Sequence, residues 1–346
     1  MSVIPSLGQG AGELAPPPPF RTPDVSFIIA AFNVAAYIEA AVASALAQND
    51  IEVEVIVVDD ASTDQTADIV ARMAAADSRV TLVRQSKNLG PGAVRNIALK
   101  HSKAKWVAIL DGDDLITANR TAELIKCAEA TGADIVGDNF ERITVDGKPT
   151  GKLLFATSDV PFLFEVDAAS FIEANQVFAR TGFSLGAIKI MVRSEFLSDH
   201  VIAHPDDLPV GEDFHFILSC LLAGARFVVT STPGYKYRLR PGSQSWRLTD
   251  EHMKKLNIAH AGLLRDVRRA GCPRAEEAAA NFGRSLERTT NFVHAVTMVS
   301  QGSWSAGLRW VASHPPIWPL VARIGSQVAF RKSMAALGLK SSAGGI

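Results

Sequence analysis

The chain has 346 residues and a net charge of −1, with 35 Lys and Arg against 36 Asp and Glu. This length allows one large domain or a domain with an appendage, and the balanced charge gives no general field for binding nucleic acid. The three cysteines are widely spaced, so they predict neither a disulfide framework nor a zinc site and fit a reducing, cytoplasmic location.

The first 23 residues are rich in Gly and Pro and lack both a basic start and an apolar core. We therefore expect a disordered leader here and not a signal peptide. No stretch approaches the roughly 18 uninterrupted apolar residues that a membrane-spanning helix needs.

From residue 25, short apolar strands alternate with amphipathic helices. The strands are predicted at residues 25–30, 53–58, 80–84, 106–110 and 133–137. The helices are predicted at about 35–48, from a cap at 62–64 to about 75, at 91–101 and at 117–131. Continuous apolar strands separated by helices indicate an α/β fold with a mostly parallel sheet covered on both faces. Ligands of such sheets bind beyond the carboxyl ends of the strands.

The second half of the chain is less regular. Asp146-Gly147 indicates a hairpin turn, residues 187–192 and 226–231 resemble strands, and residues 211–224 resemble a helix that begins with an acidic pair. Only helices are expected from residue 250. The predicted domains are therefore an α/β domain at 24–248 and a helical region at 249–346.

Three carboxylates, those of Asp111, Asp113 and Asp114, follow directly on the predicted strand at 106–110. Carboxylates this close repel one another, so a positive partner is expected. Mg²⁺ is usually held by one or two carboxylates together with substrate phosphates, which suits Mg²⁺ or Mn²⁺ here. The alternative is an acidic turn that caps the next helix.

A second acidic pair, Asp59-Asp60, follows the strand at 53–58. One carboxylate can accept hydrogen bonds from a ligand while the other organises the loop, or the pair can form a simple Asx-turn. A carboxylate here could also hold the ribose of NAD, but no G-x-G-x-x-G follows the first strand, which argues against a dinucleotide site.

Three further segments carry charged candidates. Arg95 lies one turn into the helix that begins in "NLGPGAVRN", where it is either a cleft residue or a solvated one. Asp213, after Glu212, is either a general base or a helix-capping carboxylate. Arg238 and Arg240, in "YKYRLRPGSQSWR", belong either to a basic edge strand or to a loop that closes over a diphosphate.

The C-terminal tail is basic and contains tryptophan. From Arg288 to the end there is no Asp or Glu, and Trp304, Trp310 and Trp318 lie among six basic residues. This pattern suits either a solvated helical surface or one that rests on anionic lipid.

Taken in order, "VSFIIAAFN", "VIVVDDASTDQT", "NLGPGAVRNIAL", "ILDGDDL", "GEDF" and "YKYRLRPGSQS" resemble the inverting family 2 glycosyltransferases, which have the GT-A fold. The resemblance covers roughly residues 25–246. Within the family the chain is most similar to bacterial exopolysaccharide enzymes, including the ExoO- and ExoU-like glucosyltransferases of succinoglycan assembly.

The resemblance implies a role for each candidate residue. Asp213 would be the catalytic base, and Asp113 would bind Mg²⁺ or Mn²⁺ on the diphosphate. The residues implied to contact the donor are Phe32 and Asp60 at the uracil, Asp111 at the ribose or sugar, Asp114 near the transferred sugar, Arg95 near the donor, and Arg238 and Arg240 at the diphosphate.

The activity implied is transfer of a hexose, with glucose the first candidate, from a UDP-sugar to a lipid-linked oligosaccharide at the inner face of the cytoplasmic membrane. Two alternatives stay open at this point. One is a nucleotide-sugar-binding protein without catalysis, and the other is a metal-dependent phosphohydrolase.

Overall fold

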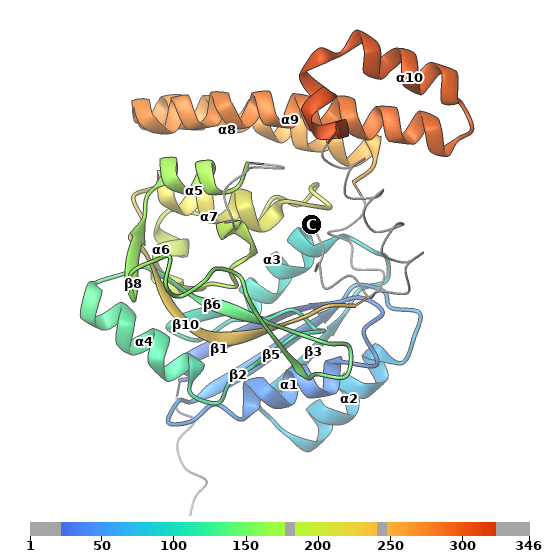
Figure 1. Ribbon diagram of the computed structural model, residues 1–346. Coiled ribbons are helices and arrows are strands. Elements are labelled where there is room, and N and C mark those ends of the chain that lie inside the picture. The colour runs from blue at the N-terminus through green and yellow to red at the C-terminus, as the bar shows by residue number, and fades with distance from the viewer. Residues whose placement is uncertain (1–21, 177–183, 241–247, 323–346) are drawn as a thin grey trace, which may run out of the picture.

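The computed structural model describes residues 22–176, 184–240 and 248–322. The described residues form a mixed sheet with helices on both faces and a helical layer above it (Figure 1). The predicted leader lies almost entirely outside the described residues, as do residues 323–346 of the basic tail.

The first half of the sheet is parallel, as predicted. In the order β3-β2-β1-β4 it contains β1 (Val25–Ala31), β2 (Val53–Asp59), β3 (Val80–Arg84) and β4 (Trp106–Ile109). Val25 of β1 lies between Val53 of β2 and Trp106 of β4. The apolar side chains of β1, β2 and β4 are buried on both faces, which explains their unbroken apolar sequence.

The second half of the sheet is mixed. β9 (Met191–Arg193) runs antiparallel between β4 and β6 (Ile135–Ile143), and β10 (Phe227–Arg238) runs parallel to β6. Three short strands pair antiparallel with β6 or β10: β5 (Leu115–Ile116), β7 (Pro149–Leu153) and β8 (Leu163–Val166). The hairpin at Asp146-Gly147 is confirmed, and Gly147 supplies the positive φ of 83° in its turn.

The helices cover the two faces of the sheet. On one face lie α1 (Ile38–Leu46), α2 (Thr66–Ala76) and α4 (Arg120–Thr131), and on the other lie α3 (Pro91–His101), α5 (Ala168–Ala174), α6 (Ser194–Asp199) and α7 (Glu212–Leu222). α2 begins at Thr66, just after the predicted cap at residues 62–64. The Asp64 carboxylate accepts the backbone N–H groups of Thr66 (2.9 Å) and Ala35 (3.1 Å), so residues 62–64 form a loop that joins α2 to the end of β1.

The C-terminal region is helical where it is described. α8 (Asp250–Ala270) and α9 (Pro273–Ser300) pack against each other above α5 and α7, and α10 (Trp304–Ser313) folds back on α9 (Figure 1). Phe282 of α9 stacks on Phe214 of α7 with ring centroids 5.1 Å apart. These helices therefore share a core with the sheet, and the boundary at 248/249 stays a prediction. None of the described helices is long and apolar enough to cross a bilayer.

A buried ion pair joins α4 to β6. Arg120 is 1% exposed and Asp138 is 3% exposed, and the guanidinium contacts the carboxylate through Nε (3.0 Å) and Nη2 (2.8 Å). Burial raises the pKa of Asp138 and Arg120 opposes that rise. Arg120 Nη2 also donates to the carbonyl oxygen of Lys189 at 2.5 Å, so this pair fixes the chain just before β9.

Arg120→Met is expected to destabilise the protein by about 3–5 kcal/mol, because it leaves Asp138 buried without its cation. Urea unfolding followed by circular dichroism at pH 7 measures the loss. The matched control is Arg84→Met, which breaks the exposed Arg84–Asp68 pair and should change the unfolding free energy by less than about 1 kcal/mol. Equal losses in the two variants would contradict this account.

Candidate active site

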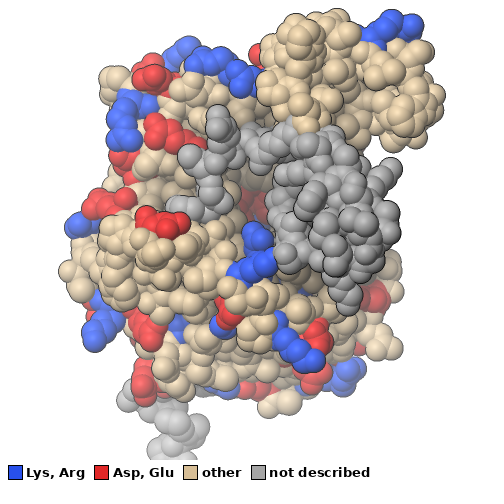
Figure 2. Space-filling model, viewed as in Figure 1, with Lys and Arg blue, Asp and Glu red and all other residues tan. Residues whose placement is uncertain are grey.

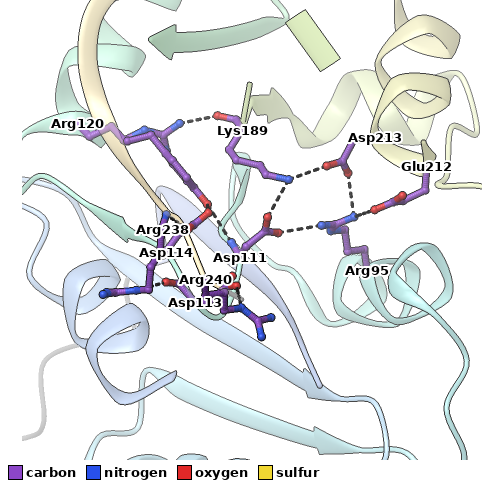
Figure 3. Close-up of polar contacts among 11 residues, drawn as sticks. Arg95, Asp111, Asp113, Asp114, Arg120, Lys189, Glu212, Asp213, Arg238 and Arg240 are labelled. Carbon is purple, nitrogen blue, oxygen red and sulfur yellow. Dashed lines mark hydrogen bonds and ion pairs between the residues drawn. The ribbon is translucent and has the colours of Figure 1, made fainter. Parts of the chain in front are cut away.

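The candidate site lies where the strands end. β1, β2, β4 and β10 run in one direction, so their carboxyl ends meet at one edge of the sheet. β9 runs the opposite way, so Lys189, two residues before it, reaches the same edge. α3 and α7 bring their first turns there, with Arg95 and Asp213 (Figure 3).

The two carboxylates after β2 differ in their contacts. Asp60 accepts the backbone N–H groups of Leu89 (2.6 Å) and Gly90 (2.9 Å), which holds the loop before α3. Asp59 accepts from Ser62 through Oδ2, and its buried Oδ1 has no hydrogen-bond partner in the described structure. Asp60 therefore organises the loop, and Asp59 keeps an acceptor available.

Asp114 ties the acidic turn to β10. It is 2% exposed, and its carboxylate accepts the Tyr235 hydroxyl (2.7 Å) and the backbone N–H of Arg238 (2.7 Å). Burial, together with Asp113 and Asp111, raises the pKa of Asp114 well above its usual range. The contact of Asp114 with a sugar stays a prediction, because the structure shows its two oxygens in contact with the protein.

Asp113 faces the two arginines at the end of β10. Its carboxylate pairs with the guanidinium of Arg240, and its backbone carbonyl accepts Arg238 Nε at 2.7 Å. Both guanidinium groups lie over the ring of Tyr37, at 5.1 and 5.8 Å from its centroid. Asp113 is thus the carboxylate of the acidic turn that pairs with Arg240, a residue of the predicted closing loop.

A divalent cation fits Asp113 by donor chemistry. Among the described residues, no group of three or more His, Cys, Asp and Glu side chains is arranged to hold a metal ion. Mg²⁺, however, is commonly bound by one or two carboxylates with substrate phosphates completing its shell. Asp113 supplies a hard oxygen donor that is partly exposed and already attracts a cation.

Arg95 joins three carboxylates from three parts of the chain (Figure 3). Its Nη2 contacts Asp111 at 2.9 Å, and its Nη1 contacts Glu212 at 2.7 Å and Asp213 at 2.8 Å. Burial alone would raise the pKa of Asp213, but Arg95 and Lys189 outweigh it and hold that pKa far below its usual range. Asp213 is therefore ionised and fixed opposite Asp111.

Lys189 is a site residue that the sequence analysis missed. Its Nζ contacts Asp111 at 2.9 Å and Asp213 at 2.7 Å, and its side chain is 9% exposed. The sequence prediction placed it inside a strand at 187–192, whereas β9 begins only at Met191. A lysine between apolar residues at the start of a strand was the available signal.

His204 lies beside the same cluster. It is 3% exposed and stacks on Phe216 with centroids 3.9 Å apart, and neither ring nitrogen has a hydrogen-bond partner in the described structure. Burial, with Arg95 and Lys189 nearby, lowers the pKa of His204 to about 3. The ring is therefore neutral at pH 7.

The structure brings most of the predicted site residues together. Arg95, Asp111 and Asp213 form one cluster, and Asp113, Asp114, Arg238 and Arg240 form a second beside it (Figure 3). Phe32 follows β1 and is 37% exposed. It lies near Asp60, because the backbone N–H of Asp60 donates to the carbonyl oxygen of the preceding residue, Ala31. The rest of the predicted closing loop, residues 241–247, lies outside the described residues.

Comparison with known proteins identifies the family. The family profile described as "Glycosyl transferase family 2" matches residues 26–194. Succinoglycan biosynthesis protein ExoO of Rhizobium meliloti (strain 1021) is 33% identical over 300 residues, which cover 87% of this chain and 84% of ExoO. The chain belongs to glycosyl transferase family 2. It is therefore a glycosyltransferase.

Two further relatives are informative. The crystal structure of S. aureus TarS 1-349 in complex with UDP-GlcNAc aligns with a TM-score of 0.64 and 22% identity, over 83% of this chain and 80% of that chain, and shares the GT-A-like fold. The "UDP-Glc:alpha-D-GlcNAc-diphosphoundecaprenol beta-1,3-glucosyltransferase WfaP" of Escherichia coli is 39% identical over 105 residues, 30% of this chain and 41% of WfaP.

His204→Phe should make the glycosyltransferase less sensitive to acid. Below pH 6.5 the unfolded chain protonates this histidine, while the folded chain does not do so until about pH 3, so wild-type stability falls across that window. The loss between pH 7 and pH 5 should be about 2 kcal/mol smaller in the variant. Urea unfolding at both pH values measures it, and an equal loss in both proteins would contradict a buried neutral ring.

Proposed function

We propose that this protein is an inverting glycosyltransferase that moves a hexose from a UDP-sugar to a hydroxyl group of a lipid-linked oligosaccharide. The observation that carries the proposal is the position of Asp213. It lies at the strand-end edge within one ion-pair cluster with Asp111, directly beside the turn that holds Asp113. A candidate base thus faces a candidate donor site.

The donor side is built from the strand-end loops. Phe32 offers an exposed ring to the uracil, and Asp60, which holds the loop before α3, is the proposed carboxylate beside it. Arg240 is the proposed cation for the diphosphate, since its guanidinium pairs with the carboxylate of Asp113 and lies over the ring of Tyr37. Arg238 holds the turn through three backbone carbonyls, those of Asp113, Thr144 and Val145.

The reaction is a single displacement. The acceptor hydroxyl oxygen forms a bond to the anomeric carbon as the bond from that carbon to the UDP oxygen breaks, and its electron pair leaves with the diphosphate. The hydroxyl proton passes to Asp213. Attack opposite the leaving group inverts the configuration, so an α-linked donor gives a β-glycoside.

The leaving diphosphate gains negative charge, which must be stabilised. A Mg²⁺ or Mn²⁺ ion held by Asp113 would supply Lewis-acid stabilisation of that charge. Arg240 would contribute from the protein: if a cation took its place on Asp113, its guanidinium could contact a phosphate oxygen.

The donor and acceptor classes are supported by the relatives. TarS was crystallised with UDP-GlcNAc, and the name of WfaP specifies UDP-Glc and a diphosphoundecaprenol-linked acceptor. ExoO belongs to succinoglycan biosynthesis. We take glucose as the first candidate sugar, exopolysaccharide assembly as the first candidate process, and UDP as the nucleotide.

The proposed acceptor is in a membrane, and α10 offers a surface for peripheral contact. Trp304 and Leu308, one turn apart on α10, are 63% and 66% exposed, and Trp318 just beyond is 51% exposed. In Figure 2 the lobe that carries α10 is almost free of charged side chains on this face. Tryptophan and leucine beside the exposed Arg309, without acidic residues, suit the inner leaflet.

Asp213→Asn should lower the transfer rate by about 10²–10⁴-fold and leave UDP binding near normal, because the amide cannot take the proton but keeps an oxygen that Arg95 or Lys189 can contact. Asp113→Asn should instead abolish the dependence of UDP binding on Mn²⁺. UDP release and calorimetric titration measure the two effects, with the exposed Asp146→Asn as control. Loss of both properties in Asp213→Asn would indicate that Glu212-Asp213 is structural.

The α10 surface is tested by co-sedimentation with phosphatidylglycerol-containing vesicles. Trp304→Ser with Leu308→Ser should weaken binding by about tenfold or more, because each exposed side chain loses apolar burial in the lipid. The control is Phe162→Ser, which removes an equally exposed ring from the loop before β8. Vesicle binding that is absent in wild type, or equal in all three proteins, would refute the membrane contact.

A further inference from the structure

A closed ring of ion pairs surrounds the proposed base. In both Asp111 and Asp213, Oδ1 contacts Arg95 and Oδ2 contacts Lys189, at distances of 2.7–2.9 Å. Each carboxylate is therefore held by both cations. In this arrangement the spacing between the donor-side carboxylate and the base is fixed from two sides (Figure 3).

The ring poses a chemical problem for the base. An acceptor hydroxyl needs a free carboxylate oxygen on Asp213, yet both oxygens are in contact with cations. A carboxylate paired twice is a weak proton acceptor, because protonation would cost both ion pairs. Opening one of the two contacts would therefore make Asp213 a better proton acceptor.

The two cations differ in how firmly they are held. Arg95 is a planar fork that also contacts Glu212, so it cannot leave Asp213 without losing a third carboxylate. Lys189 carries a compact ammonium on a flexible stem, and its backbone carbonyl is fixed by Arg120. Its ammonium can turn from Asp213 Oδ2 while it stays on Asp111.

We propose that Lys189 is a positioning residue for the transfer step: it holds Asp213 opposite Asp111 in the resting enzyme and releases Asp213 Oδ2 to the acceptor hydroxyl. This rests on the proposed function, in which Asp213 is the base. The groups that face Asp213 are Arg95 from α3, Glu212 from α7, Asp111 after β4, and the neutral His204. Lys189 also faces Asp213, and its single flexible ammonium group links Asp213 to Asp111.

The test compares Lys189→Met and Lys189→Arg by the pH dependence of UDP release from UDP-glucose, with diphosphoundecaprenol-linked sugars as acceptors. Lys189→Met should move the acid limb of kcat/KM upward by about one pH unit and lower kcat by about tenfold or more, since Asp213 loses a cation. Lys189→Arg keeps the charge, so its acid limb should stay while kcat falls through altered geometry. UDP binding should be within about threefold of wild type in both.

The control is Arg193→Met on β9. The Arg193 guanidinium lies over the side chain of Trp106, away from the ion pairs of Asp213, so this variant should leave kcat and the acid limb unchanged. If Lys189→Met does not fold, Lys189→Arg alone tests the proposal. A kcat equal to that of wild type in Lys189→Arg would refute the role of Lys189 in positioning Asp213. An active wild type with an unaffected Lys189→Met overturns the role of Lys189 only. A wild type that releases no UDP overturns the proposed function and this role together.

Discussion

The guanidinium of Arg95 is the contact on which the site depends. It holds Asp111 from the end of β4 and Glu212 and Asp213 from the start of α7, elements more than 100 residues apart in the chain. Three buried carboxylates would repel one another without it. Lys189 adds the second cation, so two positive groups fix three negative ones at the edge of the sheet.

Strand direction explains why these groups meet. The parallel strands deliver carboxylates at their carboxyl ends, while the antiparallel β9 delivers a lysine from its amino end to the same place. β10 runs parallel to β6, and Arg238 at its end and Arg240 just after it contact the acidic turn. The antiparallel strand thus adds Lys189 to an edge where the parallel strands and α3 already bring acidic and basic groups together.

The sequence predicted the parallel half of the sheet well, because β1, β2 and β4 are unbroken apolar runs whose burial determines their pattern. It also placed Arg95, Asp111, Asp113 and Asp213 in one cleft. It missed Lys189, since the only local signal was a lysine between apolar residues and the direction of β9 is set by tertiary pairing. β8 and α5 were missed because they are short and mix apolar with polar residues, so their pairing is set by tertiary contacts.

The central claim is that this edge of the sheet binds a nucleotide sugar with a divalent cation. Calorimetric titration of UDP, UDP-glucose, GDP-mannose and NAD, each with and without Mn²⁺, tests it most directly. The account predicts Mn²⁺-dependent binding of UDP and UDP-glucose, and weak or no binding of the other two. Binding of NAD, or of none of the four, would contradict the assignment of the donor.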